Sequence, residues 1–286
     1  MQDESYKVAI LIDAENVSHK YIDTIIREAS AVGVIKYKRI YGNFASPVLS
    51  SWKSVIIENA MVPVHQYNNT TGKNSSDSAL IIDAMDLLYN GNIDSFCLVT
   101  SDSDFTRLAT RLRESEIFVF GMGEQKTAKA FINACNKFIY LDLLYEHERE
   151  EVNNVESIPE TVEKRMKEEK KKNNNDVEIE QDSSEKNVQV ELLMSEKENS
   201  GANVDAVKNA IVSLINEKSA DDGWLFLGFL GSLLNQRFPD FDVRNFGYKK
   251  FVPFIESLYV FEIEKRVSNE DKNVEHVYIR NKEKVL

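Results

Sequence analysis

Residues 8–16 read VAILIDAEN, and residues 96–105 read FCLVTSDSDF. Each stretch is an apolar run that is followed by acidic residues, first Asp13 and then Asp102. Uninterrupted apolar runs of this kind are typical of central strands that are buried on both faces of a parallel sheet. In such sheets, ligands bind at the carboxyl ends of the strands, where the strand order reverses. We therefore expect these two strands to flank that point and their aspartates to converge.

The first 145 residues alternate between strand-like and helix-like patterns. Apolar, β-rich runs occur at residues 7–12, 34–41, 61–67, 96–100, 117–120 and 138–141. Helical patterns lie between them, at residues 21–31, 47–59, 77–89, 105–115 and 128–135. This alternation predicts an α/β fold with a parallel sheet and helices on both faces. The fragment GMG at residues 121–123 lacks the spacing of a dinucleotide-binding motif and predicts a turn.

The rest of the chain divides into two parts. Residues 146–203 have no aromatic side chain, and their 17 acids and 9 bases predict a flexible linker. Apolar density returns in residues 204–286. Helical patterns occupy residues 204–217, 224–238 and 246–258, and period-2 segments occupy residues 260–266 and 274–280. Three helices and a hairpin predict a small winged-helix domain, which follows the α/β domain of residues 1–145 and the linker.

The net charge of the chain is -12, although nucleic-acid-binding proteins usually carry a basic excess. The predicted linker accounts for -8 of this charge, so the two domains are nearly neutral and the objection loses its force. No apolar run approaches the ~20 residues that span a bilayer. The N-terminus lacks the basic and apolar regions of a signal peptide, so we expect a cytoplasmic protein. Two cysteines cannot form a four-cysteine zinc site and are expected in the core.

Two further acids join Asp13 and Asp102. Asp104 follows the same strand as Asp102, and Asp77 opens the helical pattern of residues 77–89 on its core side. Converging carboxylates without histidine or cysteine favour a hard cation, Mg²⁺ or Mn²⁺. The open alternative is that these acids, or neighbouring serines such as Ser101, cap helices. Positions on the helix also predict that Asp83 and Asp86 face solvent.

Several polar and basic residues are candidates for substrate contact. Asn16 could orient a phosphate or cap the next helix, and Lys73 lies in the loop before the Asp77 helix. The candidates for a basic groove are Lys36, Lys38, Arg39, Lys73, Arg107 and Arg111. In the C-terminal domain, a basic and aromatic patch is predicted from Arg244, Tyr248, Lys249 and Lys250. The alternative for that patch is a solvated helix face beside a core tyrosine.

The motifs VAILIDAEN, GKNSSDSALIIDAMDLL and LVTSDSDF resemble those of the NYN domain, the LabA-like branch of the PIN-like nuclease superfamily. The resemblance implies a metal-dependent ribonuclease fold, with metal-ligand or catalytic roles for Asp13, Asp77, Asp102 and Asp104 and with Asn16 as a polar neighbour. It also gives Asp83 an acid position of the family's helix motif. The substrate-binding candidates in this domain are Asn16, Lys73, Ser101 and Arg107.

Residues 204–286 resemble the LOTUS, or OST-HTH, domain. The resemblance rests on GWLFLGFLGSLLNQRFPDFDVRNFGYKKFVPFIESLYVFEIEK. It implies binding of RNA and, in some members, binding of other proteins. The leading hypothesis is therefore a metal-dependent endoribonuclease with an RNA-binding C-terminal domain. The alternative is a non-catalytic RNA-binding or regulatory scaffold whose LOTUS domain recruits a protein partner. DNA in place of RNA, exonucleolytic cleavage and a homodimer stay open at this point.

Two other classes of protein, a phosphatase and a receiver domain, fit the residues poorly. A haloacid-dehalogenase phosphatase needs D-x-D after its first strand, where this chain has Asp13, Ala14 and Glu15. A response-regulator receiver needs an aspartate after the third strand, where this chain has His65.

Overall fold

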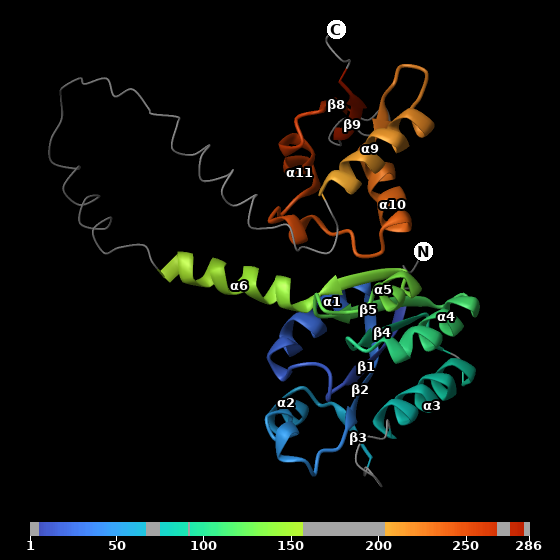
Figure 1. Cartoon of the computed structure of the whole chain (residues 1–286), viewed down its shortest axis with the longest axis vertical. Coiled ribbons are helices and arrows are strands. Elements are labelled where there is room, and N and C mark those ends of the chain that lie inside the picture. Colours follow the sequence, from blue (N-terminus) through green and yellow to red (C-terminus); the bar gives the residue numbers. More distant parts are fainter. Residues whose placement is uncertain (1–5, 67–74, 91, 157–203, 268–274, 283–286) are drawn as a thin grey trace, which may run out of the picture. The chain divides into compact units, whose positions relative to one another are not determined.

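The computed structural model describes residues 6–66, 75–90, 92–156, 204–267 and 275–282, with side chains described up to residue 149 in the segment that ends at 156. Lys73 and most of the predicted linker lie outside these residues. The N-terminal region is a six-stranded parallel sheet in the order β3-β2-β1-β4-β5-β6 (Figure 1). Its strands are β1 (Tyr6–Asp13), β2 (Gly33–Gly42), β3 (Val62–His65), β4 (Ser95–Val99), β5 (Phe118–Gly123) and β6 (Lys137–Tyr140).

The strand order confirms the prediction from the two apolar runs. β1 pairs with β4 at the centre of the sheet, and the order reverses between them, because β2 and β3 extend to one side and β5 and β6 to the other. All five residues of β4 are buried, as are the last six of β1. Such doubly covered strands need no polar face, which explains why their sequences are continuously apolar.

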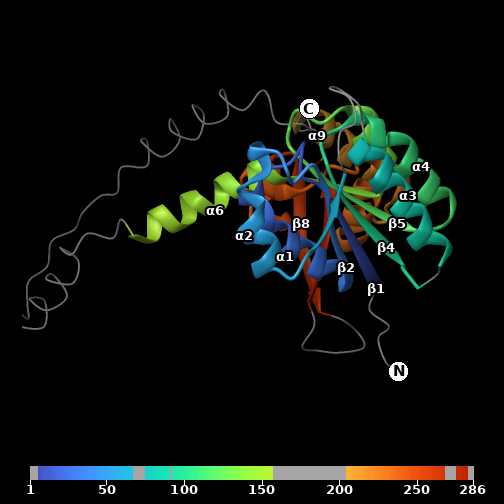
Figure 2. The ribbon, with the colours of Figure 1, turned by 90° about the horizontal axis from the view of Figure 1, so that it is seen from below.

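Helices cover both faces of the sheet (Figure 2). α1 (Ile22–Val32) and α2 (Trp52–Glu58) lie on one face, and α3 (Ser75–Tyr89) and α4 (Thr106–Glu114) lie on the other. This division follows from the topology, since a right-handed crossover changes face when the chain reverses its direction across the sheet. The remaining elements of the region are η1 (His19–Tyr21), η2 (Pro47–Leu49), η3 (Ser103–Phe105), α5 (Lys129–Ala134) and α6 (Leu141–Glu156).

Two sequence predictions in this region are wrong. The GMG fragment forms the end of β5 and not a turn. A Cβ atom on Gly121 would lie 2.6 Å from the Cys135 sulfur, so glycine is needed there for close packing and not for turn formation. α6 also continues to Glu156, past the predicted start of the linker at residue 146. Glutamate and arginine are good helix formers, so high polarity alone did not mark the helix end.

The C-terminal region contains α9 (Val204–Lys218), β7 (Leu225–Phe226), α10 (Leu227–Arg237), η5 (Val243–Phe246), α11 (Phe251–Ser257), β8 (Phe261–Val267) and β9 (Glu275–Asn281). The predicted hairpin is present, and β7 adds a third strand in the order β7-β9-β8. The helix predicted from residue 224 begins later because Leu225 and Phe226 pair with β9. The helix predicted from residue 246 is interrupted by Gly247, whose φ of 81° is left-handed.

Each region has its own hydrophobic core. In the C-terminal core, Phe241, Phe246, Phe251 and Phe254 contact one another with ring centroids 5.0–6.5 Å apart. Cys97 and Cys135 are buried and form no disulfide, as predicted for small core residues. Among the described residues, none of the helices combines the length and apolar character needed to cross a bilayer.

Candidate metal centre

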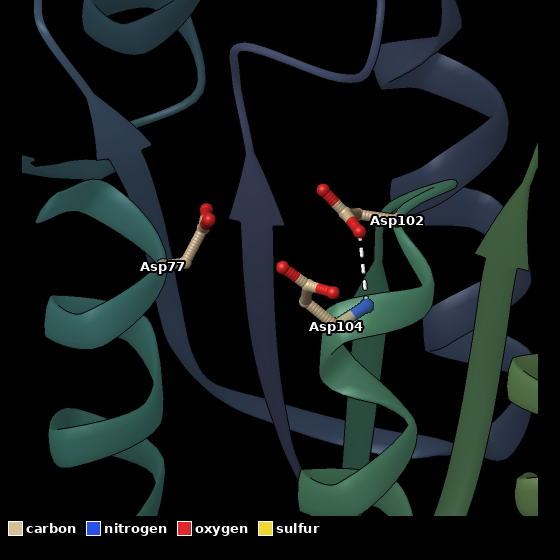
Figure 3. A group of neighbouring side chains, drawn as sticks. All are labelled: Asp77, Asp102 and Asp104. Atoms are coloured by element: carbon tan, nitrogen blue, oxygen red, sulfur yellow. Dashed lines mark hydrogen bonds between the residues drawn. The ribbon is translucent and has the colours of Figure 1, made fainter. Parts of the chain in front are cut away.

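Three aspartates meet at the carboxyl edge of the sheet beside β1 and β4. One carboxylate oxygen from each of Asp77, Asp102 and Asp104 lies within 4.8 Å of the other two. Asp77 is in the first turn of α3, and the other two belong to the connection between β4 and α4. Figure 3 shows the three carboxylates directed towards one another from these two elements. Residues 25 positions apart in the sequence therefore form one acidic cluster, which we call the aspartate cluster.

Local hydrogen bonds hold the β4 side of the aspartate cluster. The backbone N–H of Asp102 donates to the Thr100 hydroxyl at 3.1 Å, and Asp102 Oδ1 accepts from the backbone N–H of Asp104 at 2.9 Å (Figure 3). Asp102 is thus the N-cap of η3. The cap and the cluster interpretations are both satisfied, because one oxygen is sufficient for capping and Asp102 also reaches the other two acids.

Asp13 lies beside the aspartate cluster, but its environment differs. Its side chain is 2% exposed and accepts four hydrogen bonds. They come from the Asn16 amide at 2.8 Å, the Thr100 hydroxyl at 2.9 Å, and the backbone N–H groups of Glu15 at 3.1 Å and Asn16 at 3.3 Å. Burial nevertheless raises the pKa of Asp13. The four donors occupy about all the lone pairs of a carboxylate, and the bond from Thr100 connects the end of β1 to the residue that follows β4.

Asp77 shows the electrostatic consequence of this crowding. Burial, followed by repulsion from Asp13, Asp102, Glu15 and Asp104, raises its pKa to about 6. Like charges that share a site make each further ionisation unfavourable. A divalent cation would reverse the sign of this interaction, because it attracts the same carboxylates that repel one another.

Glu15 is a fifth acid at this edge, and it was not among the predicted site residues. Glu15 Oε2 accepts from the Ser76 hydroxyl at 2.8 Å, and Oε1 accepts from the backbone N–H of Asn43 at 3.3 Å. It therefore connects the loop after β1 to α3 and to the loop after β2. The available signal was its position two residues after Asp13, at the end of the first strand.

The predicted polar substrate contacts have partners within the protein. The Asn16 amide donates to Asp13, and the Ser101 hydroxyl accepts from the backbone N–H of Glu124 at 2.9 Å. Arg107 is exposed in the first turn of α4, three residues after Asp104. Of these three, Arg107 retains the clearest access to a ligand at the aspartate cluster.

Most of the predicted basic groove is dispersed. Lys36 lies in the first half of β2, far from its carboxyl end, and the Lys38 ammonium donates to the Asn59 carbonyl. Arg111 donates to the hydroxyls of Ser115, at 2.6 Å, and Tyr89, at 3.2 Å. Alternation along a strand and spacing on a helix indicated faces, but they did not reveal these partners.

The prediction that Asp83 faces solvent is wrong. It does not face solvent, because its carboxylate accepts from Arg39 and from the Tyr41 hydroxyl, both on β2. α3 lies over β1 and β2, so a residue on the side of the helix reaches the neighbouring strand. This pairing also removes Arg39 from the basic groove. Asp86 is exposed, as predicted.

The predicted C-terminal patch is divided between two environments. The Arg244 guanidinium donates to Glu28 of α1 at 2.7 and 3.0 Å and to Asp242 at 2.7 Å, and these partners raise its pKa. Glu28 and Arg244 belong to the same compact unit of the chain. Tyr248 packs edge-on against Phe254 with ring centroids 5.6 Å apart. Lys249 and Lys250 are exposed.

Comparison with known proteins assigns both regions. Residues 7–142 match the model of the NYN domain, and residues 202–272 match that of the OST-HTH/LOTUS domain, which confirms the resemblance read from the motifs. No curated protein matches the chain. A crystal structure of a protein of unknown function from Vibrio parahaemolyticus RIMD 2210633 is 17% identical, with a TM-score of 0.40, over 48% of this chain and 94% of that one.

Proposed function

Since the chain carries an NYN domain followed by an OST-HTH/LOTUS domain, we propose that it is a ribonuclease whose aspartate cluster binds Mg²⁺ or Mn²⁺. The NYN family is a PIN-like nuclease family, and the OST-HTH/LOTUS domain is of an RNA-binding type. The observation that carries the proposal is the convergence of Asp77, Asp102 and Asp104 within 4.8 Å, at the point where strand order reverses.

The donor set fits a hard divalent cation. All three groups are carboxylates, and oxygen ligands are those that Mg²⁺ and Mn²⁺ prefer. Because one oxygen of each carboxylate lies within 4.8 Å of the other two, Asp77, Asp102 and Asp104 could together hold one such ion. Such an ion supplies Lewis-acid stabilisation of a phosphodiester and lowers the pKa of a water molecule that it binds.

The residues of the chain would divide the remaining work. Asp77 contributes its carboxylate from α3, while Asp102 and Asp104 contribute theirs from a backbone that is fixed by the η3 cap. Beside the aspartate cluster, Asp13 holds the turn at Glu15 and Asn16 with three hydrogen bonds and contacts Thr100, which follows β4, with the fourth. Arg107, exposed on the first turn of α4, is placed to contact a substrate phosphate.

Metal-dependent cleavage of RNA by the full chain tests this proposal. Labelled single-stranded and hairpin RNAs are incubated with Mg²⁺, with Mn²⁺ or with EDTA, and the products are resolved on a gel. Internal products would identify an endonuclease. We expect cleavage with either ion and none in EDTA. Products that persist in EDTA, or wild-type protein that is inert towards RNA across the metal series, would contradict the proposal, and RNA binding without cleavage would favour the scaffold hypothesis.

Asp102→Asn is the informative variant, because asparagine caps helices as well as aspartate does and removes only the charge. Loss of a ligand that stabilises transition-state charge by several kcal/mol predicts a fall in cleavage rate of at least about 100-fold, with a melting temperature that is not lowered. Ser103→Ala, in the same turn, is the matched control. Asp13→Asn is less suitable, since its amide NH₂ would face existing donors and destabilise the fold.

A further inference from the structure

We propose that the OST-HTH domain binds single-stranded RNA on the outer face of its three-stranded sheet, and not through the basic segment of residues 244–250. We call this surface the stacking face. It is formed by Trp224, Phe226, Arg266, His276, Tyr278 and Arg280. This inference rests on the RNA-binding part of the proposed function and identifies the surface that performs it.

The strand register places these side chains on one face. Phe226 of β7 pairs with Tyr278 of β9, and the neighbouring pair, Leu225 with Ile279, is buried in the core. Successive residues of a strand point to opposite faces, so Phe226 and Tyr278 point outward. His276 and Arg280 lie two residues to either side of Tyr278 and share its face. Arg266 of β8 pairs with His276 and therefore lies on the same face.

The rings of the stacking face form a contiguous group. The Phe226 ring lies 5.3 Å from His276 and 5.8 Å from Tyr278, measured between centroids. Phe226 is 40% exposed, although burying a phenylalanine would normally be favourable. An exposed aromatic ring that the fold itself positions is suited to stacking of a base, which contributes about 1–3 kcal/mol.

Two arginines lie on the same rings. The Arg266 guanidinium lies 4.6 Å from the Tyr278 centroid and 5.2 Å from that of Trp224, and the Arg280 guanidinium lies 4.7 Å from Trp224. Planar guanidinium groups above aromatic rings can stack on bases and can donate to phosphates. The stacking face thus combines both kinds of contact that single-stranded RNA offers.

Acidic neighbours reduce the net charge of the stacking face. Arg266 contacts Asp222 at 3.4 Å and Glu264 at 3.2 Å, and Arg280 contacts Glu262 at 2.6 Å. These pairs are solvent-exposed, so the arginines can exchange them for phosphates at little cost. Attraction to phosphates alone would therefore be weak, and base stacking should dominate. This predicts that RNA affinity depends only shallowly on salt.

The competing segment offers less to a ligand. Arg244 is paired with Glu28 and Asp242, Asn245 and Phe246 are buried, and Tyr248 packs against a core ring. Lys249 and Lys250 are exposed there together with Gly247, and they present charge without a ring. A basic segment of that kind would bind phosphates with a steep salt dependence.

Tryptophan fluorescence of the full chain in EDTA, where metal-dependent cleavage is suppressed, tests the inference. The probe is an unlabelled single-stranded RNA of mixed sequence. The chain has two tryptophans, Trp224 and the buried Trp52, which is 2% exposed. The fluorescence of a Trp52→Phe variant therefore comes from Trp224 alone. We expect quenching on titration, and a log affinity that falls with log salt with a slope of about -2, since two or three phosphates are neutralised.

Substitutions complete the test. Phe226→Leu and Tyr278→Leu keep apolar bulk but remove the ring, and each should weaken binding about 5- to 150-fold. Tyr259→Ala removes a ring that is 80% exposed in the turn before β8 and should leave the affinity unchanged. Unchanged affinity in both leucine variants would overturn the inference, as would loss of binding in Lys249→Ala with Lys250→Ala alone. Either result would leave the stacking face as a protein-docking surface, and the proposed nuclease activity would still stand. Wild-type protein that binds no RNA would instead overturn both this inference and the RNA-binding part of the proposed function.

Discussion

Two carboxylates at the same edge of the sheet, Asp13 and Asp102, have different environments. Asp13 is the last residue of β1, and Asp102 lies three residues after the adjacent strand β4. Asp13 accepts from four donors, whereas Asp102 reaches two other acids. The sequence predicts that both lie at this edge, because strand ends follow from apolar runs. It does not predict the difference, which depends on the Thr100 hydroxyl and the Asn16 amide in three dimensions.

Protonation of Asp77 gives a prediction at the same scale. Its pKa is raised to about 6 in the folded protein from an ordinary value of 3.8, so the folded state binds this proton more tightly. The resulting stability is complete below pH 3.8 and is lost as the pH rises through 6. In EDTA, Asp77→Asn should therefore stabilise the protein at pH 7.5 more than at pH 4.5.

The size of this effect is limited by solvent. Asp77 is half-buried and water screens part of the repulsion, so we expect about 1 kcal/mol at pH 7.5 and not the full value of the shift. Urea denaturation at the two pH values measures it. Asp86→Asn, an exposed acid on the same helix, is the control. An equal gain for Asp77→Asn at both pH values would mean that the acids do not repel one another in the folded state.

Pairing between helix and strand decides which acids are available to a ligand. α3 presents Asp77 to the sheet edge, and two turns later it presents Asp83 to Arg39 and Tyr41 of β2. Helical periodicity predicts the direction of Asp77, but it wrongly predicts an exposed Asp83. Helical periodicity describes a helix in isolation, whereas α3 packs against both β1 and β2.

Asp83→Ala tests this structural role. The substitution leaves the Tyr41 hydroxyl and the Arg39 guanidinium without their partner, and the Tyr41 side chain is 1% exposed. We expect a loss of about 2–4 kcal/mol in the free energy of unfolding. The cleavage rate per folded molecule should be retained. A variant that unfolds normally but cannot cleave RNA would instead place Asp83 among the ligands.

Element boundaries show the same limit of sequence reasoning. All six strands of the NYN domain were located from apolar, β-rich runs, and burial gives the strongest local signal in the central strands β1 and β4. The two-residue strand β7 was assigned to a helix, since it is defined by its partner β9 and not by its own composition. The stacking face depends on that strand, so it could not be derived from the sequence alone.

Charge distribution links the two domains at the scale of the whole molecule. The net charge of -12 comes mostly from residues 146–203, and the NYN and OST-HTH regions are nearly neutral. Nucleic acid would therefore be held by short-range contacts: a divalent ion at the aspartate cluster and stacked bases on the OST-HTH sheet. Long-range attraction of the whole chain to phosphate would contribute little, because the overall field has the wrong sign.

Binding of Mn²⁺ followed by electron paramagnetic resonance tests the central claim most directly, because it detects the free ion without any substrate. Titration of the full chain at pH 7.5 should remove the free Mn²⁺ signal until the site is saturated, and Mg²⁺ should restore it by competition. Asp102→Asn should weaken binding at least about 10-fold, while Ser103→Ala should not change it. Equal Mn²⁺ affinity in the wild type and Asp102→Asn would contradict the assignment of the aspartate cluster as a metal centre.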